Sequence, residues 1–347
     1  SGVSVEAARL RHLVGSTKVE TFPLGKTGYV LRYAGFSQRG YEPGDPYQGN
    51  QDRYALLPAF AGKPDQMFMG IFDGHGVEGD AAANFVKDHI GGELSKLMSR
   101  DKYKFDFRRA FLQTFISLDE QMHHASQFDD SRSGCTAIAA CFRGNDLLVA
   151  NIGNSRAILG ERRGNRVIAY SLSVDQTPYR RDERERVKAC GARVLTMAMA
   201  KGEEAINPDW LTDADDLEGA GDTPLVFGRS SQSPGYAFTR CLGDSMSANL
   251  GLNAEAELVQ KQLREQDQFI VLASDGVWEF LTNQNVCQTV MEYTEPVAAC
   301  QAIIGQAYAH WLQLEVRTDD ITLILAYIDS SEGQAPRPPS EDEVAEY

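Results

Sequence analysis

Residues 136–172 read TAIAACFRGNDLLVANIGNSRAILGERRGNRVIAYSL, and this stretch decides the fold that we expect. It holds four short runs of β-branched and apolar residues, at 136–142, 147–152, 157–159 and 167–172. The tripeptide Arg-Gly-Asn follows the first run and also precedes the fourth run. Gly-Asn between two strand-like runs is typical of a hairpin turn. The stretch therefore predicts antiparallel hairpins rather than a doubly wound parallel sheet.

Further strands and helices are expected in separate blocks. Strand-like runs recur at 67–72, 269–273 and 321–328. Apolar spacing of 3.6 residues, together with start and stop signals, predicts helices at four places: after Asp106 as an N-cap, over 86–97, from Pro296 as a first helical residue, and between Thr177-Pro178 and Gly191. Separate blocks of strands and helices are typical of a layered α+β domain.

The composition is that of a globular protein with a strong negative charge. Hydrophobic residues make up 42% and charged residues 24% of the 347 positions, which excludes a fibrous or wholly disordered chain. The formal charge of −15 repels phosphate backbones, so we expect no nucleic-acid partner. No apolar run approaches the length of a membrane span. Six scattered cysteines without a Cys-x-x-Cys pair predict buried, reduced thiols and an intracellular location, cytoplasmic or nuclear.

Three strand-like runs carry carboxylates at one end. One run leads into Asp73-Gly74-His75-Gly76, a second leads into Ser274-Asp275-Gly276, and Asp319-Asp320 precede a third. If the strands are neighbours, carboxylates that meet without Lys or Arg repel one another and require a cation. Oxygen ligands alone select hard ions such as Mg²⁺ or Mn²⁺. If the strands lie apart, the same residues are separate turn or cap aspartates. Both possibilities stay open at this point.

Seven short motifs follow one another over most of the chain. They are Gly49-Asn50-Gln51-Asp52, Asp73-Gly74-His75-Gly76, Ser133-Gly134-Cys135-Thr136-Ala137, Ile152-Gly153-Asn154-Ser155-Arg156-Ala157, Ala237-Phe238-Thr239-Arg240-Cys241-Leu242-Gly243-Asp244, Ala273-Ser274-Asp275-Gly276-Val277-Trp278-Glu279 and Asp319-Asp320-Ile321-Thr322. One such motif has little specificity, but seven in this order are highly specific. With these motifs the chain resembles the metal-dependent protein serine/threonine phosphatases of type 2C over roughly residues 30–328.

The resemblance implies a particular α+β fold and a metal centre. The family's fold is a sandwich of two antiparallel β-sheets flanked by α-helices, and its centre holds two divalent ions, here Mg²⁺ or Mn²⁺. By resemblance, Asp73 bridges both ions and the Gly74 carbonyl contacts one of them. Asp275 and Asp319 complete the other site. Two such ions activate a water and stabilise an in-line displacement at phosphorus.

The resemblance also implies roles for residues around the ions. His75 corresponds to the general acid that protonates the leaving oxygen, a task suited to an imidazole at neutral pH. Asp52 corresponds to an acid that orders metal-bound water. Gln51 stands where many members have Glu in the outer shell of the site. An insert at 41–48 interrupts the match to the family's phosphate-binding arginine, and Arg39 is our candidate for that role.

Two departures concern a third, weaker metal site of the family. Asn154 stands where the typical motif has Asp, and Glu279 likewise replaces an Asp. We therefore expect two ions and leave a third one open.

We expect three parts along the chain. Residues 1–29 form an N-terminal extension that begins with a polar, helix-tolerant segment, residues 30–329 form the catalytic domain, and residues 330–347 form a polar tail. The acidic, glycine-rich segment 201–235 lacks periodicity and corresponds to a flap beside the family's active centre. We expect its acids to favour basic phosphopeptides.

The sequence and the resemblance together predict a monomeric phosphatase that acts on phosphoprotein substrates. It would hydrolyse phosphoserine and phosphothreonine by direct attack of a metal-activated water, without a phosphoenzyme. Two alternatives stay open: a catalytically weak pseudophosphatase that acts as a binding module, and a metallohydrolase of small phosphate esters. The presence of Asp73, Asp275 and Asp319 favours an active enzyme, because an inactive relative usually lacks at least one of them.

Overall fold

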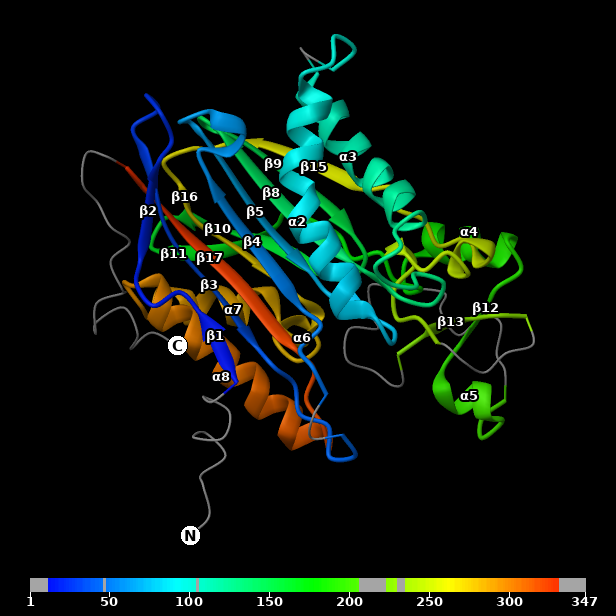
Figure 1. The fold of residues 1–347 in the computed structure, drawn as a ribbon. Helices are drawn as coiled ribbons and strands as arrows, with labels where there is room; N and C mark the ends of the chain where they lie inside the picture. Colours follow the sequence, from blue (N-terminus) through cyan, green and yellow to red (C-terminus); the bar gives the residue numbers. More distant parts are fainter. Residues whose placement is uncertain (1–11, 46–47, 104–105, 206–222, 230–234, 331–347) are drawn as a thin grey trace.

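Two antiparallel sheets form the centre of the computed structural model, which describes residues 12–45, 48–103, 106–205, 223–229 and 235–330 (Figure 1). The first sheet has the order β1-β3-β17-β16-β10-β11, and β2 also pairs with β3. Its strands are β1 (Leu13–Gly15), β2 (Glu20–Pro23), β3 (Tyr29–Gln38), β10 (Arg156–Arg163), β11 (Arg166–Ser171), β16 (Asp267–Ala273) and β17 (Ile321–Ser330). The second sheet has the order β15-β9-β8-β5-β4. Its strands are β4 (Arg53–Pro58), β5 (Gln66–Phe72), β8 (Ala137–Arg143), β9 (Asp146–Ile152) and β15 (Glu257–Gln262).

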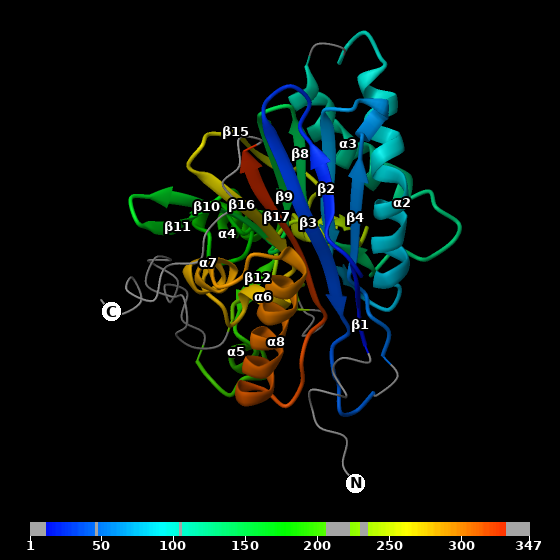
Figure 2. The ribbon, with the colours of Figure 1, turned by 90° about the vertical axis from the view of Figure 1, so that its left-hand side faces the viewer.

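Helices cover the outer face of each sheet, as Figures 1 and 2 show from two sides. The second sheet packs against α2 (Gly79–Met98) and α3 (Phe107–Met122), and the first sheet packs against α7 (Asn283–Met291) and α8 (Pro296–Leu314), next to the short α6 (Asp275–Trp278). The remaining elements are η1 (Phe60–Gly62), α4 (Arg181–Ala189), α5 (Met197–Lys201), η3 (Ser247–Leu250), the pair β12 (Arg193–Leu195) and β13 (Leu225–Phe227), and the small sheet of β6 (Gly74–His75), β7 (Gly134–Cys135) and β14 (Leu242–Gly243). The expected α+β sandwich is confirmed.

Strand β5 shows why the two sheets stack. Met67, Met69 and Ile71 belong to the buried cluster between the sheets, whereas Phe68 and Phe72 belong to the cluster beneath α2 and α3. Alternate residues of a strand point to opposite faces, so an apolar strand of this kind is buried on both faces. The core therefore has three layers: helix against sheet, sheet against sheet, and sheet against helix.

The two predicted hairpins are present, but they lie in different sheets. Arg143 pairs with Asp146 across the turn between β8 and β9, and Arg163 pairs with Arg166 across the turn between β10 and β11. Gly144 in the first of these turns has a positive φ of 59°, a backbone region that glycine enters without strain. Strand β9 belongs to the second sheet and β10 to the first, so residues 153–155 carry the chain between the sheets.

The helix signals are confirmed where the sequence has a clear start. The Asp106 side chain accepts a hydrogen bond from the Arg109 N–H at 2.9 Å, as expected of an N-cap. Pro296 is the first residue of α8, where its missing N–H costs no helical bond.

The N-terminal segment differs from the expectation. Residues 13–15 and 20–23, expected in a helix-tolerant extension, form β1 and β2 against β3. Most of the predicted acidic flap, at 206–222 and 230–234, and the tail at 331–347 lie outside the described residues. The division into three parts stays a prediction.

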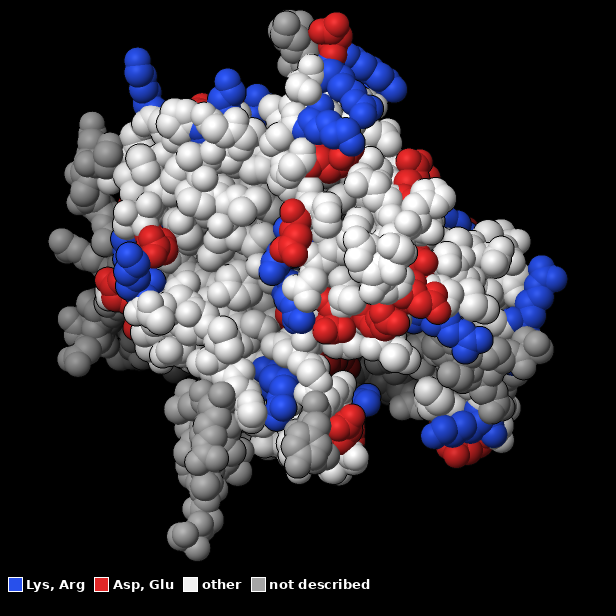
Figure 3. Space-filling view, in the orientation of Figure 1, with Lys and Arg blue, Asp and Glu red and all other residues white. Residues whose placement is uncertain are grey.

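Three expectations drawn from the composition concern the acidic surface, membrane spans and the cysteines. On the face in Figure 3, acidic side chains gather below α2 and α3. Within the described ranges, no helix is long and apolar enough to cross a membrane. All six cysteines are free, and five of them are buried; the expectation of a buried thiol is wrong for Cys190, which is exposed after α4.

Candidate active site

Several strand ends meet at one end of the sandwich. Arg53, the first residue of β4, pairs with Phe72, the last residue of β5. In the other sheet, Ala273 at the end of β16 pairs with Leu323 near the start of β17. Asp52, Asp73, Asp275 and Asp319 directly flank these ends, and the Ser274 hydroxyl donates to Asp52 Oδ2 at 2.7 Å between the sheets. The alternative of separate turn aspartates is therefore wrong.

Electrostatics at this end show a shortage of positive charge. Loss of surrounding water, followed by repulsion from Asp275, Asp52 and Asp319, raises the pKa of Asp73 well above its usual value. Burial, followed by repulsion from Asp320, raises the pKa of Asp52 to about 7. Asp73 and Asp275 are also in hydrogen-bond contact, which two ionised carboxylates cannot make because both only accept. A cation between them would remove this conflict.

Hydrogen bonds distinguish Asp319 from its neighbour Asp320. Both carboxylate oxygens of Asp320 accept backbone N–H groups, Oδ1 from Gly40 at 2.6 Å and Oδ2 from Gln51 at 2.7 Å. Asp320 therefore ties the end of β3 to the loop before β4. The Asp319 side chain is exposed, and its Oδ1 accepts the Asp320 N–H at 2.8 Å.

Gly74 has a steric reason to be glycine. A Cβ atom built there would lie 2.2 Å from the Gly79 carbonyl oxygen and 2.8 Å from the Gln51 carbonyl oxygen. The Gln51 side chain also donates from Nε2 to the Gly76 carbonyl at 2.8 Å. A glutamate at position 51 could not donate this bond, so the departure from the family's Glu has a structural consequence.

Two buried oxygens at the site have no hydrogen-bond partner among the described residues: Asp52 Oδ1 and Asn154 Oδ1. Buried polar atoms are usually satisfied, so each of them is suited to a water or an ion. All the carboxylate, amide and carbonyl ligands here are oxygen donors, the set that Mg²⁺ and Mn²⁺ prefer. The residues therefore fit a divalent metal centre.

Comparisons with known proteins agree with this geometry. The family model described as Protein phosphatase 2C matches residues 47–311. The chain belongs to the protein phosphatase 2C family. Members of this family are metal-dependent protein phosphatases that act on serine and threonine.

Similar plant proteins and similar solved structures agree with this family assignment. The chain is 41% identical over 301 residues to "Probable protein phosphatase 2C 35" of Arabidopsis thaliana, covering 86% of this chain and 84% of that protein. It is 30% identical to "Probable protein phosphatase 2C 64" of Oryza sativa, covering 81% of this chain and 62% of that protein. A Toxoplasma gondii phosphatase 2C structure shares the fold with a TM-score of 0.69 and 19% identity, covering 91% and 100% of the two chains. Staphylococcus aureus Stp1 gives a TM-score of 0.56 and 16% identity, covering 86% and 95%.

Arg39 and Glu279 lie at the margin of the protein phosphatase 2C site. Arg39 follows β3, its Nη2 is 3.1 Å from His12 Nε2, and its charge acts on Asp320. The Glu279 side chain is exposed after α6, and repulsion from Asp275 adds to the effect of desolvation in raising its pKa. The phosphate-binding role of Arg39 stays a prediction.

Asn154 provides a donor where an aspartate would provide a ligand. Its Nδ2 donates to Asp275 Oδ2 at 2.8 Å. This bond fixes the orientation of Asp275 without adding negative charge, so the position attracts a cation less strongly than an Asp would.

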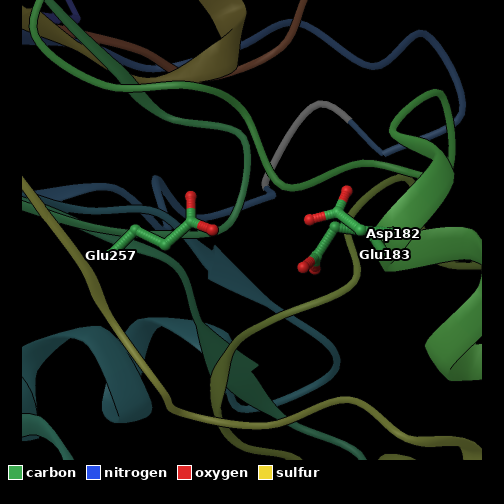
Figure 4. Close-up of side chains that lie close together, drawn as sticks. All are labelled: Asp182, Glu183 and Glu257. Atoms are coloured by element: carbon green, nitrogen blue, oxygen red, sulfur yellow. The ribbon is translucent and has the colours of Figure 1, made fainter.

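A second acidic group, shown in Figure 4, has a different role. Oxygens of Asp182, Glu183 and Glu257 lie within 4.8 Å of one another. Arg186 Nη1 and Arg240 Nη2 each lie 2.6 Å from Glu183 Oε1, and Arg180 is bonded to both Asp182 and Glu257 at 2.7 Å. Because three guanidinium groups already neutralise these carboxylates, this is an ion-pair network of the phosphatase and not a metal site.

Asp244, the last residue of the motif at 237–244, has no predicted role but contacts His75. Its Oδ2 lies 3.2 Å from His75 Nε2. The only signal in the sequence is the position of Asp244 directly after a Leu-Gly pair in that motif.

Proposed function

We propose that this chain hydrolyses phosphoserine and phosphothreonine in proteins at a centre of two Mg²⁺ or Mn²⁺ ions. Asp73, Asp275, Asp319 and the Gly74 carbonyl would hold the ions. The observation that carries the proposal is the group of converging carboxylates: burial and then their mutual repulsion raise the pKa of Asp73. When bound, such ions lower the pKa of a water molecule and neutralise charge that develops around phosphorus.

The chain's own side chains orient the reactants. The Ser274 hydroxyl donates to Asp52 Oδ2, and Asp52 Oδ1 has no described partner. Oδ1 can therefore accept a hydrogen bond from the attacking water. Asn154 keeps Asp275 in place. His75 would give a proton to the serine or threonine oxygen as the P–O bond breaks. No residue of this scheme forms a covalent bond to phosphorus.

The proposal is tested by hydrolysis of a phosphoserine peptide with Mn²⁺ added and then chelated. We expect turnover with the metal and its loss with the chelator. No turnover at any metal concentration would favour the pseudophosphatase, and activity confined to small esters would favour the metallohydrolase of such esters.

The role of His75 is tested by the leaving group. His75→Ala should slow hydrolysis of phosphoserine by about 10²–10⁴-fold, the usual contribution of a general acid. An ester of an acidic phenol should lose much less, because its leaving group needs little protonation. His310→Ala, an exposed histidine of α8, is the control and should leave both rates unchanged. Equal losses on both substrates would contradict the assignment.

A further inference from the structure

Three very short strands bring His75 and Asp244 together. His75 of β6 pairs with Gly134 of β7, and Gly134 pairs on its other side with Gly243 of β14. A Cβ atom on Gly134 would lie 3.0 Å from His75 Cε1 and 3.1 Å from Nε2. The missing side chain therefore lets the imidazole lie across β7 and reach the residue that follows β14, which is Asp244.

The Asp244 carboxylate is held from several sides. Its side chain is fully buried, and its Oδ2 is 3.2 Å from His75 Nε2. Its Oδ1 accepts the Ser247 N–H at 3.2 Å, and the Tyr236 hydroxyl donates to the same carboxylate. Asp244 also has a φ of +51°, a backbone conformation that is strained in a residue other than glycine. Such strain is found where the surroundings hold a side chain in one position.

Aromatic rings enclose the imidazole on the same side. The Phe238 ring centroid is 4.7 Å from that of His75, and the Tyr236 ring meets it edge-on at 6.2 Å. His75 Nδ1 is buried and has no hydrogen-bond partner within the described part of the chain. One ring nitrogen therefore faces Asp244, and the other has no hydrogen bond that would compete for its hydrogen in the described part of the chain.

We propose that Asp244 is a positioning residue that fixes the ring of His75 and the nitrogen through which it acts. A carboxylate oxygen accepts in such a contact, so the geometry of Nε2 facing Oδ2 at 3.2 Å places the shared hydrogen on His75 Nε2. Nδ1 is then the atom that delivers the proton. As the P–O bond breaks, its electron pair stays on the serine or threonine oxygen, which takes the Nδ1 proton and leaves a neutral imidazole. This inference rests on the role of His75 proposed above.

Kinetics of Asp244→Asn test the proposal. Asparagine has the same size and tolerates a positive φ, but its amide no longer provides a carboxylate. We expect hydrolysis of a phosphoserine peptide to fall roughly 10–100-fold, part of the usual contribution of a general acid. The rate of hydrolysis of an ester of an acidic phenol should fall less than about threefold. Thermal melting of the variant shows whether it is folded.

A double-mutant cycle separates positioning from a general structural effect. If Asp244 acts through His75, adding Asp244→Asn to His75→Ala should not lower the rate of phosphoserine hydrolysis any further. A loss in that background as large as in the wild type would overturn the proposal. Tyr236→Phe is the matched variant: it removes one donor to Asp244 but retains the carboxylate, and we expect a smaller loss than for Asp244→Asn.

A spectroscopic measurement is independent of turnover. In metal-free protein with ¹⁵N-labelled histidine at pH 8, the His75 signal, identified by its loss in His75→Ala, should show hydrogen on Nε2. Asp244→Asn should shift it toward hydrogen on Nδ1. Hydrogen on Nδ1 in the wild type, or no change in the variant, would overturn the proposal. If the wild type hydrolyses no phosphopeptide but this signal behaves as expected, the proposed function fails and the contact with Asp244 stands.

Discussion

At the scale of single residues, small differences in side-chain chemistry set the charge of the metal centre. Gln51 and Asn154 each provide an amide donor, one to the Gly76 carbonyl and the other to Asp275. A carboxylate at either position would lose that bond and add to the repulsion that, after burial, raises the pKa of Asp73. The two amides therefore stabilise the arrangement of ligands and keep the number of carboxylates down.

Asp73→Asn should have opposite effects on activity and on the stability of the metal-free protein. Turnover and the stabilisation by metal should be lost, because the residue supplies charge to the ions. The metal-free variant should melt at a higher temperature, because one repelling carboxylate is removed. We expect its free energy of unfolding to rise by roughly 1 kcal/mol. Asp80→Asn in the exposed first turn of α2 is the control. Melting curves with and without metal measure both effects. Wild-type turnover by Asp73→Asn would exclude Asp73 as a metal ligand.

At the scale of elements, the buried charge of Glu183 binds α4 to the segment that precedes β14. The Glu183 side chain is 1% exposed and accepts from Arg186 on the same helix and from Thr239 and Arg240 of that segment. Burial alone would raise the pKa of Glu183, but bonds from Arg240, Arg186 and Thr239 outweigh it and lower the pKa to about 2. The network therefore favours the ionised form.

Glu183→Gln should destabilise the protein in a pH-dependent way. The folded pKa lies below the usual value of 4.5, so the wild type has the full contribution of Glu183 above that pH and loses it as the pH falls toward 2. We expect a loss of about 3 kcal/mol at pH 6, since arginines are left unpaired, and a smaller difference at pH 3. Urea unfolding at both values measures this. Glu185→Gln, on the exposed side of α4, should change little, and a pH-independent loss in Glu183→Gln would contradict the argument.

At the scale of the whole molecule, the two sheets bring the four site carboxylates together from distant parts of the chain. Asp52 and Asp73 flank strands of the second sheet, and Asp275 and Asp319 lie next to strand ends of the first. In the metal-free state, packing of the two sheets therefore brings carboxylates close together. Their repulsion offsets part of the stability that burial of the hydrophobic core provides. A bound cation reverses the sign of this interaction.

Binding of Mg²⁺ should stabilise the protein more at pH 8 than at pH 6. Asp73 and Asp52 have raised pKa values in the folded state, the latter about 7, so the metal-free fold loses stability as the pH rises through this range. Metal competes with protons for these oxygens and binds more tightly at higher pH. Saturating Mg²⁺ should raise the melting temperature by a few degrees at pH 8, reversibly with chelator. An equal shift at both pH values would contradict the assignment.

The sequence was informative wherever a signal is local. The Asp106 cap, the Pro296 start and the Gly-Asn turns each depend on a few neighbouring residues, and all are present in the structure. The strands β1 and β2 were missed, because three or four residues carry too little periodicity and are stabilised by pairing with β3. His123 has two close acidic partners, Asp119 four residues earlier and Asp130 seven residues later.

The sequence by itself determined the ends of the three strands that lead to the site, and therefore which carboxylates could reach a common centre. Hairpin pairing follows from two-residue turns, so a short stretch specifies it. Only the tertiary structure decided that β9 and β10 lie in different sheets, that both oxygens of Asp320 bind backbone N–H groups, and that Asp244 contacts His75. The last contact spans 169 residues. Such a pair depends on how three strands pack around Gly134, and no local preference of either residue encodes it.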